Sequence, residues 1–235
     1  FDPTNPDQLY FVVEVGDNGL EQMWTVDVGA GSAADIASSA TLLAGSFNEA
    51  PNGTNPDYRT IHDIAFDEDA TDPDGVRLLV LYENAAVEAT ETAPGQAAGT
   101  IIAEMDFNPA AVTNPNETNT NSLNPIESLT FAGGPELGFT GLVLLSDDPA
   151  TTDNQFLLTQ SAGPDSDLFS VDLAVGGELN RLGSAKDLDD NSAPILGYDL
   201  QDLTYIPTLT DPFTGEMGAF VATDGSSVQL ALVNT

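Results

Sequence analysis

The sequence of 235 residues has no cysteine, a single histidine and only four basic residues. Without cysteine there is no disulfide framework, no thiolate zinc site and no cysteine nucleophile. A Ser-His-Asp triad would have to use His62, and the G-x-S-x-G motif of serine hydrolases does not occur beside it. The sequence therefore argues against hydrolysis through a serine or cysteine nucleophile.

The basic residues are scattered singly along the chain, at Arg59, Arg77, Arg181 and Lys186. Nucleic-acid phosphates are bound by clusters of lysine and arginine, so we expect no nucleic-acid partner. Apolar runs are short as well, and none approaches the roughly 20 residues that a membrane-spanning helix needs. We therefore expect no membrane span.

Acidic residues are abundant instead, because 38 aspartates and glutamates give a formal net charge of −34. A surface of this kind repels itself at low ionic strength and requires high salt, divalent cations or both. Two environments fit: a salt-adapted organism, and an extracellular or cell-surface matrix in which Asp-rich loops bind Ca²⁺. Aspartates crowded beside Asn, Gly and Pro in loops favour the second, with Ca²⁺ as the expected cofactor, although aspartate also closes turns without a metal.

Short apolar runs of strand length recur between turn-forming residues, which is typical of an all-β protein. The clearest runs cover residues 9–15, 22–28, 77–82, 100–107, 155–159, 167–173 and 219–223. Helical periodicity is almost absent, and only residues 33–43 carry plausible helix formers, weakened by serine and threonine. The sequence therefore predicts an all-β fold.

The predicted strands align as a repeated unit, whose members we call the first, second, third and fourth strand. First strands are predicted at 62–66, 140–144 and 201–205, each followed by an acidic hairpin loop and an apolar second strand. The second strands end on an acid or amide, at Glu14, Glu83, Gln160 and Asp224. Fourth strands are predicted at 40–44, 127–131 and 179–183, and residues 113–125 are expected to form an exposed polar loop.

The third strands share a turn-forming residue at one matching place, occupied by Asp27, Asp106, Asp172 and Asn234. Aspartate and asparagine side chains accept hydrogen bonds from the backbone of a following turn, so we expect these residues to end their strands in the same way. The alignment predicts equivalent environments for all of them.

Four-stranded antiparallel units that repeat along a chain are typical blades of a β-propeller. We predict one β-propeller domain over residues 1–235, with blade parts at 1–50, 60–131, 139–185 and 199–235. The first and last units show only three strands, so we expect part of a larger ring, completed by missing parts of the same chain or by other protein subunits. A β-sandwich is the alternative, although it would not require the recurring third-strand aspartate.

In strand patterns such as LFSVDL at 168–173, the chain resembles the propeller superfamily of YVTN-type surface repeats, phytase-like propellers and PhoX-like phosphatases. Propeller geometry brings the start of the first strands and the end of the second strands to one channel mouth, where this resemblance implies a catalytic metal. Oxygen ligands for a hard cation are expected there from Asp63, Asp202, Glu83 and Asp224. Gly141 replaces the acid in the third unit, and no basic residue is visibly placed to hold a phosphate.

A second candidate metal site is the first acidic hairpin loop, formed by Asp67, Asp69, Asp72 and Asp74. The spacing of its aspartates resembles a calcium-binding loop, but the bidentate glutamate of an EF-hand is missing. A hydrated turn adapted to salt is the alternative interpretation of this segment.

These observations predict a non-catalytic extracellular or cell-surface module with a structural, adhesion or assembly role, dependent on Ca²⁺ or salt. No catalytic residue is assigned. The alternative is a calcium-dependent propeller hydrolase of the phosphoesterase or lactonase type, in which the channel-mouth carboxylates hold a metal that activates water. Only analogy of fold supports this alternative.

Overall fold

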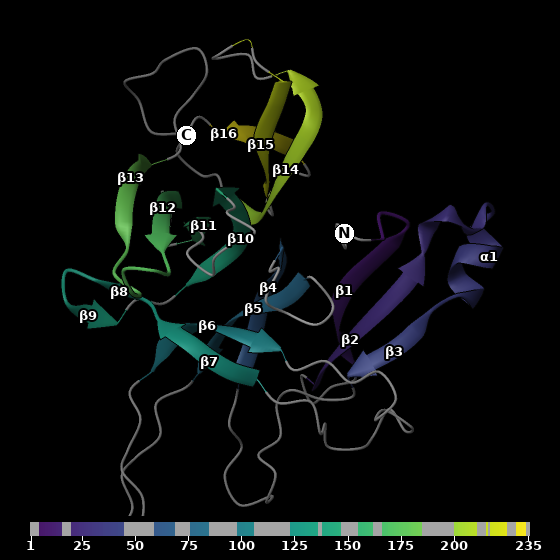
Figure 1. The fold of residues 1–235 in the computed structure, drawn as a ribbon, viewed down its shortest axis with the longest axis horizontal. Coiled ribbons are helices and arrows are strands. Elements are labelled where there is room, and N and C mark those ends of the chain that lie inside the picture. The colour runs from purple at the N-terminus through teal and green to yellow at the C-terminus, as the bar shows by residue number, and fades with distance from the viewer. Residues whose placement is uncertain are drawn as a thin grey trace, which may run out of the picture. The chain divides into compact units, whose positions relative to one another are not determined.

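The all-β prediction is confirmed by a computed structural model of the chain (Figure 1). The structure describes residues 5–15, 20–44, 59–68, 76–84, 98–105, 123–135, 138–146, 155–161, 166–184, 200–210, 215, 217–224 and 229–233. The chain divides into two compact units. Unit 1 contains Phe1–Ser128 and Pro149–Thr151, and unit 2 contains Leu129–Asp148 and Thr152–Thr235.

Unit 1 contains two antiparallel sheets whose strands follow one another in chain order. The first sheet consists of β1 (Gln8–Val15), β2 (Leu20–Asp27) and β3 (Thr41–Ala44). The second consists of β4 (Arg59–Glu68), β5 (Val76–Asn84), β6 (Gly99–Met105) and β7 (Leu123–Ser128).

Two short helical segments connect β2 to β3, and only the second of them lies within residues 33–43, where the sequence showed plausible helix formers. They are η1 (Val28–Ala30) and α1 (Ala33–Ser38). The hydroxyl of Ser32 accepts a hydrogen bond from the Asp35 N–H (3.2 Å), which caps the first turn of α1. Within the described ranges, no helix is long and apolar enough to cross a membrane.

Unit 2 contains a small hairpin and two further antiparallel sheets in chain order. The hairpin is formed by β8 (Thr130–Phe131) and β9 (Gly134–Pro135). A four-stranded sheet follows, with β10 (Phe139–Ser146), β11 (Gln155–Ser161), β12 (Ser166–Asp172) and β13 (Asn180–Ser184). The last sheet has β14 (Leu200–Thr210), β15 (Met217–Asp224) and β16 (Gln229–Val233).

The predicted strand assignments are wrong in detail around β7. The fourth strand was expected at 127–131, but it begins at Leu123 and includes the last residues of the predicted loop 113–125. Pro125 lies in β7, the edge strand of its sheet. Proline is tolerated in an edge strand because its missing N–H need not interrupt the hydrogen bonds between strands.

The hairpin β8–β9 was not predicted. Its turn residues Ala132 and Gly133 have positive φ angles of 52° and 79°, as a type I′ turn requires. Residues 106–122 lie outside the described ranges.

The three first strands share a β-bulge at one position of their pairing with the second strand. In β4 the bulge lies between Ile61 and Asp63, so the extra residue is His62. Its counterparts are Thr140 in β10 and Gln201 in β14. The predicted alignment of the first strands is therefore confirmed by backbone pairing, independently of side-chain chemistry.

The core of unit 1 lies between strands of its two sheets. In unit 1, Met23 of β2 packs with Val80 and Tyr82 of β5, and the rings of Tyr10 and Phe66 meet edge to face at 4.9 Å. Strand β5 is buried on both faces, because consecutive residues from Leu78 to Tyr82 are at most 6% exposed. In unit 2, Phe131 and Phe139 each meet the ring of Phe169 at 5.6 Å.

Candidate functional site

The start of the first strands was predicted to carry metal-binding carboxylates. Asp63 follows the bulge in β4, is half-buried, and accepts a hydrogen bond from the Ile64 N–H at 2.7 Å. Asp202 holds the matching position of β14, and its side chain lies outside the described part of the structure. The structure thus places both residues at equivalent positions of their strands, while their common use as ligands stays a prediction.

Gly141 occupies the same position in β10, and packing explains why this strand has no acid there. A Cβ atom at Gly141 would lie 2.6 Å from the Thr159 hydroxyl and 2.9 Å from the backbone nitrogen of Leu203 in β14. Backbone atoms of a packed strand cannot move aside as a flexible side chain can. The close approach of β14 therefore excludes any side chain, acidic or otherwise.

The predicted alignment of the second-strand ends is wrong by one residue in the second sheet. Gln160 and Asp224 pair with Phe139 and Leu200, which directly precede the bulge in their first strands. In the second sheet the residue directly before the bulge is Ile61. It pairs with Tyr82, which is therefore the counterpart of Gln160 and Asp224. Glu83 lies one residue further along β5. Because side chains alternate across a strand, Glu83 points to the opposite face of its sheet from the position that Gln160 and Asp224 share.

No three histidine, aspartate or glutamate side chains come together as metal ligands within the described ranges. The side chain of Asp224, like that of Asp202, lies outside them. The channel-mouth site of Asp63, Asp202, Glu83 and Asp224 stays a prediction, because the register of β5 shows only that Glu83 does not hold the strand position of Asp224.

His62, the extra residue of the first bulge, lies beside Glu83. Its Nε2 atom is 3.6 Å from the Glu83 Oε2 and makes no hydrogen bond to the described part of the chain, although the atom is buried. Burial lowers the pKa of His62 below its ordinary value of 6.5, and the Glu83 carboxylate opposes part of this shift. The folded protein therefore favours the neutral imidazole.

The lowered pKa of His62 predicts that the fold loses stability as the pH falls. Below pH 6.5 the His62 side chain of the unfolded chain binds a proton that the folded protein resists. The contribution of neutral His62 to the free energy of unfolding is therefore complete above pH 6.5 and is lost as the pH falls through the folded-state pKa. We expect the wild-type protein to lose more stability between about pH 7.5 and pH 5 than His62→Gln does. Urea unfolding of both proteins in high salt measures the difference, and parallel losses would contradict the assignment.

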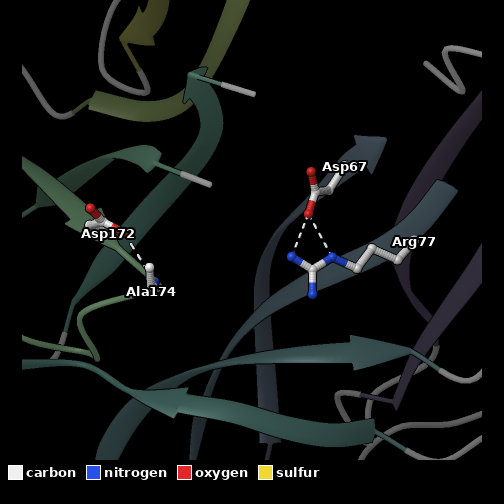
Figure 2. A network of polar contacts seen from close by, with 4 residues as sticks. All are labelled: Asp67, Arg77, Asp172 and Ala174. Carbon is white, nitrogen blue, oxygen red and sulfur yellow. Dashed lines mark hydrogen bonds and ion pairs between the residues drawn. The ribbon is translucent and has the colours of Figure 1, made fainter. Parts of the chain in front are cut away.

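The predicted calcium loop begins differently from the expectation, because β4 continues through Glu68. Asp67 therefore lies in a strand, fully buried, where one carboxylate oxygen accepts from the Nε (2.6 Å) and Nη2 (2.5 Å) of Arg77 (Figure 2). A guanidinium at this distance repels any cation, so Asp67 is not suited to bind calcium. Asp69, Asp72 and Asp74 lie outside the described residues.

A second arginine is also bound to an aspartate. Arg181 of β13 donates from Nε and Nη2 to the two carboxylate oxygens of Asp167 in β12, at 2.8 and 2.7 Å. The Asp167 carboxylate raises the pKa of Arg181. Neither pair was predicted from the sequence, since their members are ten and fourteen residues apart and meet only across paired strands. The pairing of Asp67 with Arg77 could have been predicted from the register of the β4–β5 hairpin, which makes them direct cross-strand partners.

The third-strand aspartates behave as predicted where the structure describes them. Asp27 accepts from the Gly29 N–H at 2.9 Å, and Asp172 accepts from the Ala174 N–H at 3.0 Å (Figure 2). Each aspartate also pairs across its sheet with a glutamine that begins the second strand. The predicted equivalence is confirmed for this pair, while Asp106 and Asn234 lie outside the described residues.

Because Asp172 satisfies the turn that ends β12, replacing it should destabilise the protein moderately. We expect Asp172→Ala to lower the free energy of unfolding by about 1 kcal/mol, the usual effect of removing a capping acceptor. Asp172→Asn keeps an acceptor oxygen and should cost less. Urea unfolding tests both variants, and equal losses for alanine and asparagine would show that the hydrogen bond to Ala174 contributes nothing.

Comparison with protein-family models, curated proteins and solved structures found no match to this chain. The contacts of the described residues are therefore the basis for a functional proposal.

Proposed function

We propose that the protein is a non-catalytic extracellular or cell-surface module of the β-propeller type, with a structural, adhesion or assembly role and a dependence on Ca²⁺ or salt. The observation that supports it best is the engagement of strand-end carboxylates by the protein's own groups. Turn amides bind Asp27 and Asp172, a backbone N–H binds Asp63, and Arg77 binds Asp67. Carboxylates used in this way stabilise a scaffold.

The shared pairing register favours a propeller over a β-sandwich. All three sheets that contain a first strand have a bulge at the same position, and all four sheets follow one another in chain order. In unit 2 the first strands β10 and β14 contact each other, as first strands of neighbouring blades would. A sandwich gives no reason for one bulge position to recur. An experimental structure with the sheets stacked in two layers would contradict this part of the proposal.

The net charge of −34 supports the dependence on cations, because a compact state with this charge is destabilised by its own repulsion. Ca²⁺ would bind through oxygen ligands of the acidic hairpin loops. In the first of these loops the candidates are now Asp69, Asp72 and Asp74, since Asp67 is bound to Arg77. An extracellular or cell-surface setting supplies both calcium and salt.

A test for catalysis decides between this module and a calcium-dependent hydrolase. We expect no phosphodiesterase or lactonase turnover above a buffer blank, with Ca²⁺ or with EDTA, from the wild-type protein. Asp63→Asn removes a predicted metal ligand, whereas Asp27→Asn changes a turn aspartate and serves as the matched control. Turnover that Asp63→Asn abolishes and Asp27→Asn preserves, with circular dichroism unchanged in both, would refute the non-catalytic proposal.

A further inference from the structure

Among the described residues, no strand pairs with the edge of β1 that faces away from β2, in a place where the other sheets have a further strand. In the sheets of β5, β11 and β15, the second strand pairs with a first strand on one side and a third strand on the other. The equivalent second strand β1 pairs only with β2 among the described residues. The repeat thus shows which kind of strand belongs at this edge.

The backbone groups along this edge point outward in an alternating pattern. The carbonyl of Asp7 accepts from the Val28 N–H at 2.8 Å, and in antiparallel pairing every second residue then bonds to the same neighbour. Odd-numbered residues of β1 consequently bond to β2. Val12 and Glu14 direct their N–H and C=O groups away from β2, toward the open edge.

Apolar side chains of β1 are less buried than their counterparts in β5. Leu9, Phe11 and Val13 are apolar and only half-buried. Their counterparts in β5, which has a first strand beside it, are at most 6% exposed: Leu78, Val80 and Tyr82. An apolar strand with an unpaired edge is a template for adding another strand.

We propose that the open edge of β1 is a docking site for an extended polypeptide segment with the pattern of this chain's first strands. The segment pairs antiparallel with β1, in the same register in which β4 pairs with β5. Its β-bulge lies between the residue opposite Val13 and the residue opposite Val12. The residue opposite Val12 corresponds to Asp63, Gly141 and Asp202 of the three first strands. The residue opposite Phe11 is apolar and corresponds to Ile64, Leu142 and Leu203. The inference rests on pairing register and burial, and does not require the proposed function.

A peptide with the sequence of β4, Arg59–Glu68, tests the proposal on the full chain. Trp24 is the single tryptophan of the protein, lies opposite Phe11 in β2, and has no counterpart in the peptide. We expect saturable binding reported by Trp24 fluorescence. Hydrogen exchange measured with and without the peptide should show slower exchange at the amides of Val12 and Glu14.

The control peptide carries proline in place of Asp63 and Ala65, which in the native sheet pair with Leu81 and Leu79 of β5 and in the proposed register would stand opposite Val12 and Tyr10. It should bind at least tenfold more weakly, because proline cannot donate to the edge of β1. Equal affinity for both peptides, no saturable binding, or protection away from β1 would overturn the proposal. A dimer that protects the amides of β1 without peptide would overturn it too, since a second copy would then cover the edge.

Discussion

Arg77→Leu is expected to lower the free energy of unfolding by about 3–5 kcal/mol, the usual effect of removing one partner of a buried ion pair. The Asp67 carboxylate is fully buried, and the Arg77 side chain is only 6% exposed. Without the guanidinium, the folded protein must bury an uncompensated negative charge or protonate it. Urea unfolding near neutral pH, in salt high enough to screen surface charge, measures the loss.

Two controls separate the buried pair from a simple change of net charge. Arg181→Leu makes the same change in charge at an ion pair whose arginine is 46% exposed, and should cost less than about 1 kcal/mol. The double variant Asp67→Leu/Arg77→Leu should recover most of the loss, because an apolar pair of similar volume avoids the desolvation of both ions. A similar loss for Arg77→Leu and Arg181→Leu would contradict the structural role of the buried pair.

Removing cations is expected to lower the thermal unfolding midpoint strongly. The formal charge of −34 repels itself in the compact state, and screening shortens the range of that repulsion. For a chain of this size, each kcal/mol of relieved repulsion raises the midpoint by roughly 2–4 °C. The measurement compares three buffers: EDTA at low salt, EDTA with molar KCl, and millimolar Ca²⁺.

The same measurement distinguishes general screening from specific calcium sites. A variant with Asp69, Asp72 and Asp74 all changed to asparagine should keep its stabilisation by KCl and lose part of its stabilisation by Ca²⁺. Stabilisation of the wild-type protein by KCl alone would favour salt adaptation over calcium binding. Equal midpoints in all three buffers would refute the dependence on cations.

Local chemistry was sufficient to predict the strands and the turns that end them. Alternating apolar residues placed the second and third strands, and the structure confirms them within a few residues. Asp27 and Asp172 were predicted to hold the following turn because an aspartate can reach the amide two residues later without help from the rest of the fold. Predictions of this kind depend on neighbours in sequence.

Predictions that compared residues across strands failed where chemistry and register disagreed. Glu83 was grouped with Gln160 and Asp224 because all three end a second strand with a polar side chain. Backbone pairing places Glu83 one residue further, which reverses the face of its side chain. Asp67 was assigned to a loop because its neighbours are acidic, yet Arg77 pairs with it inside the sheet.

By itself, the sequence determined the all-β class, the repeat of strands, the turn aspartates and the strong negative charge. Tertiary structure alone decided which polar residues serve the scaffold. Arg77 neutralises Asp67 only because the hairpin register places them opposite each other, and Gly141 is required only because the backbone of β14 comes close. The physical reason is that hydrophobic periodicity and turn chemistry act over a few residues, whereas burial and charge pairing depend on strands that are distant in sequence.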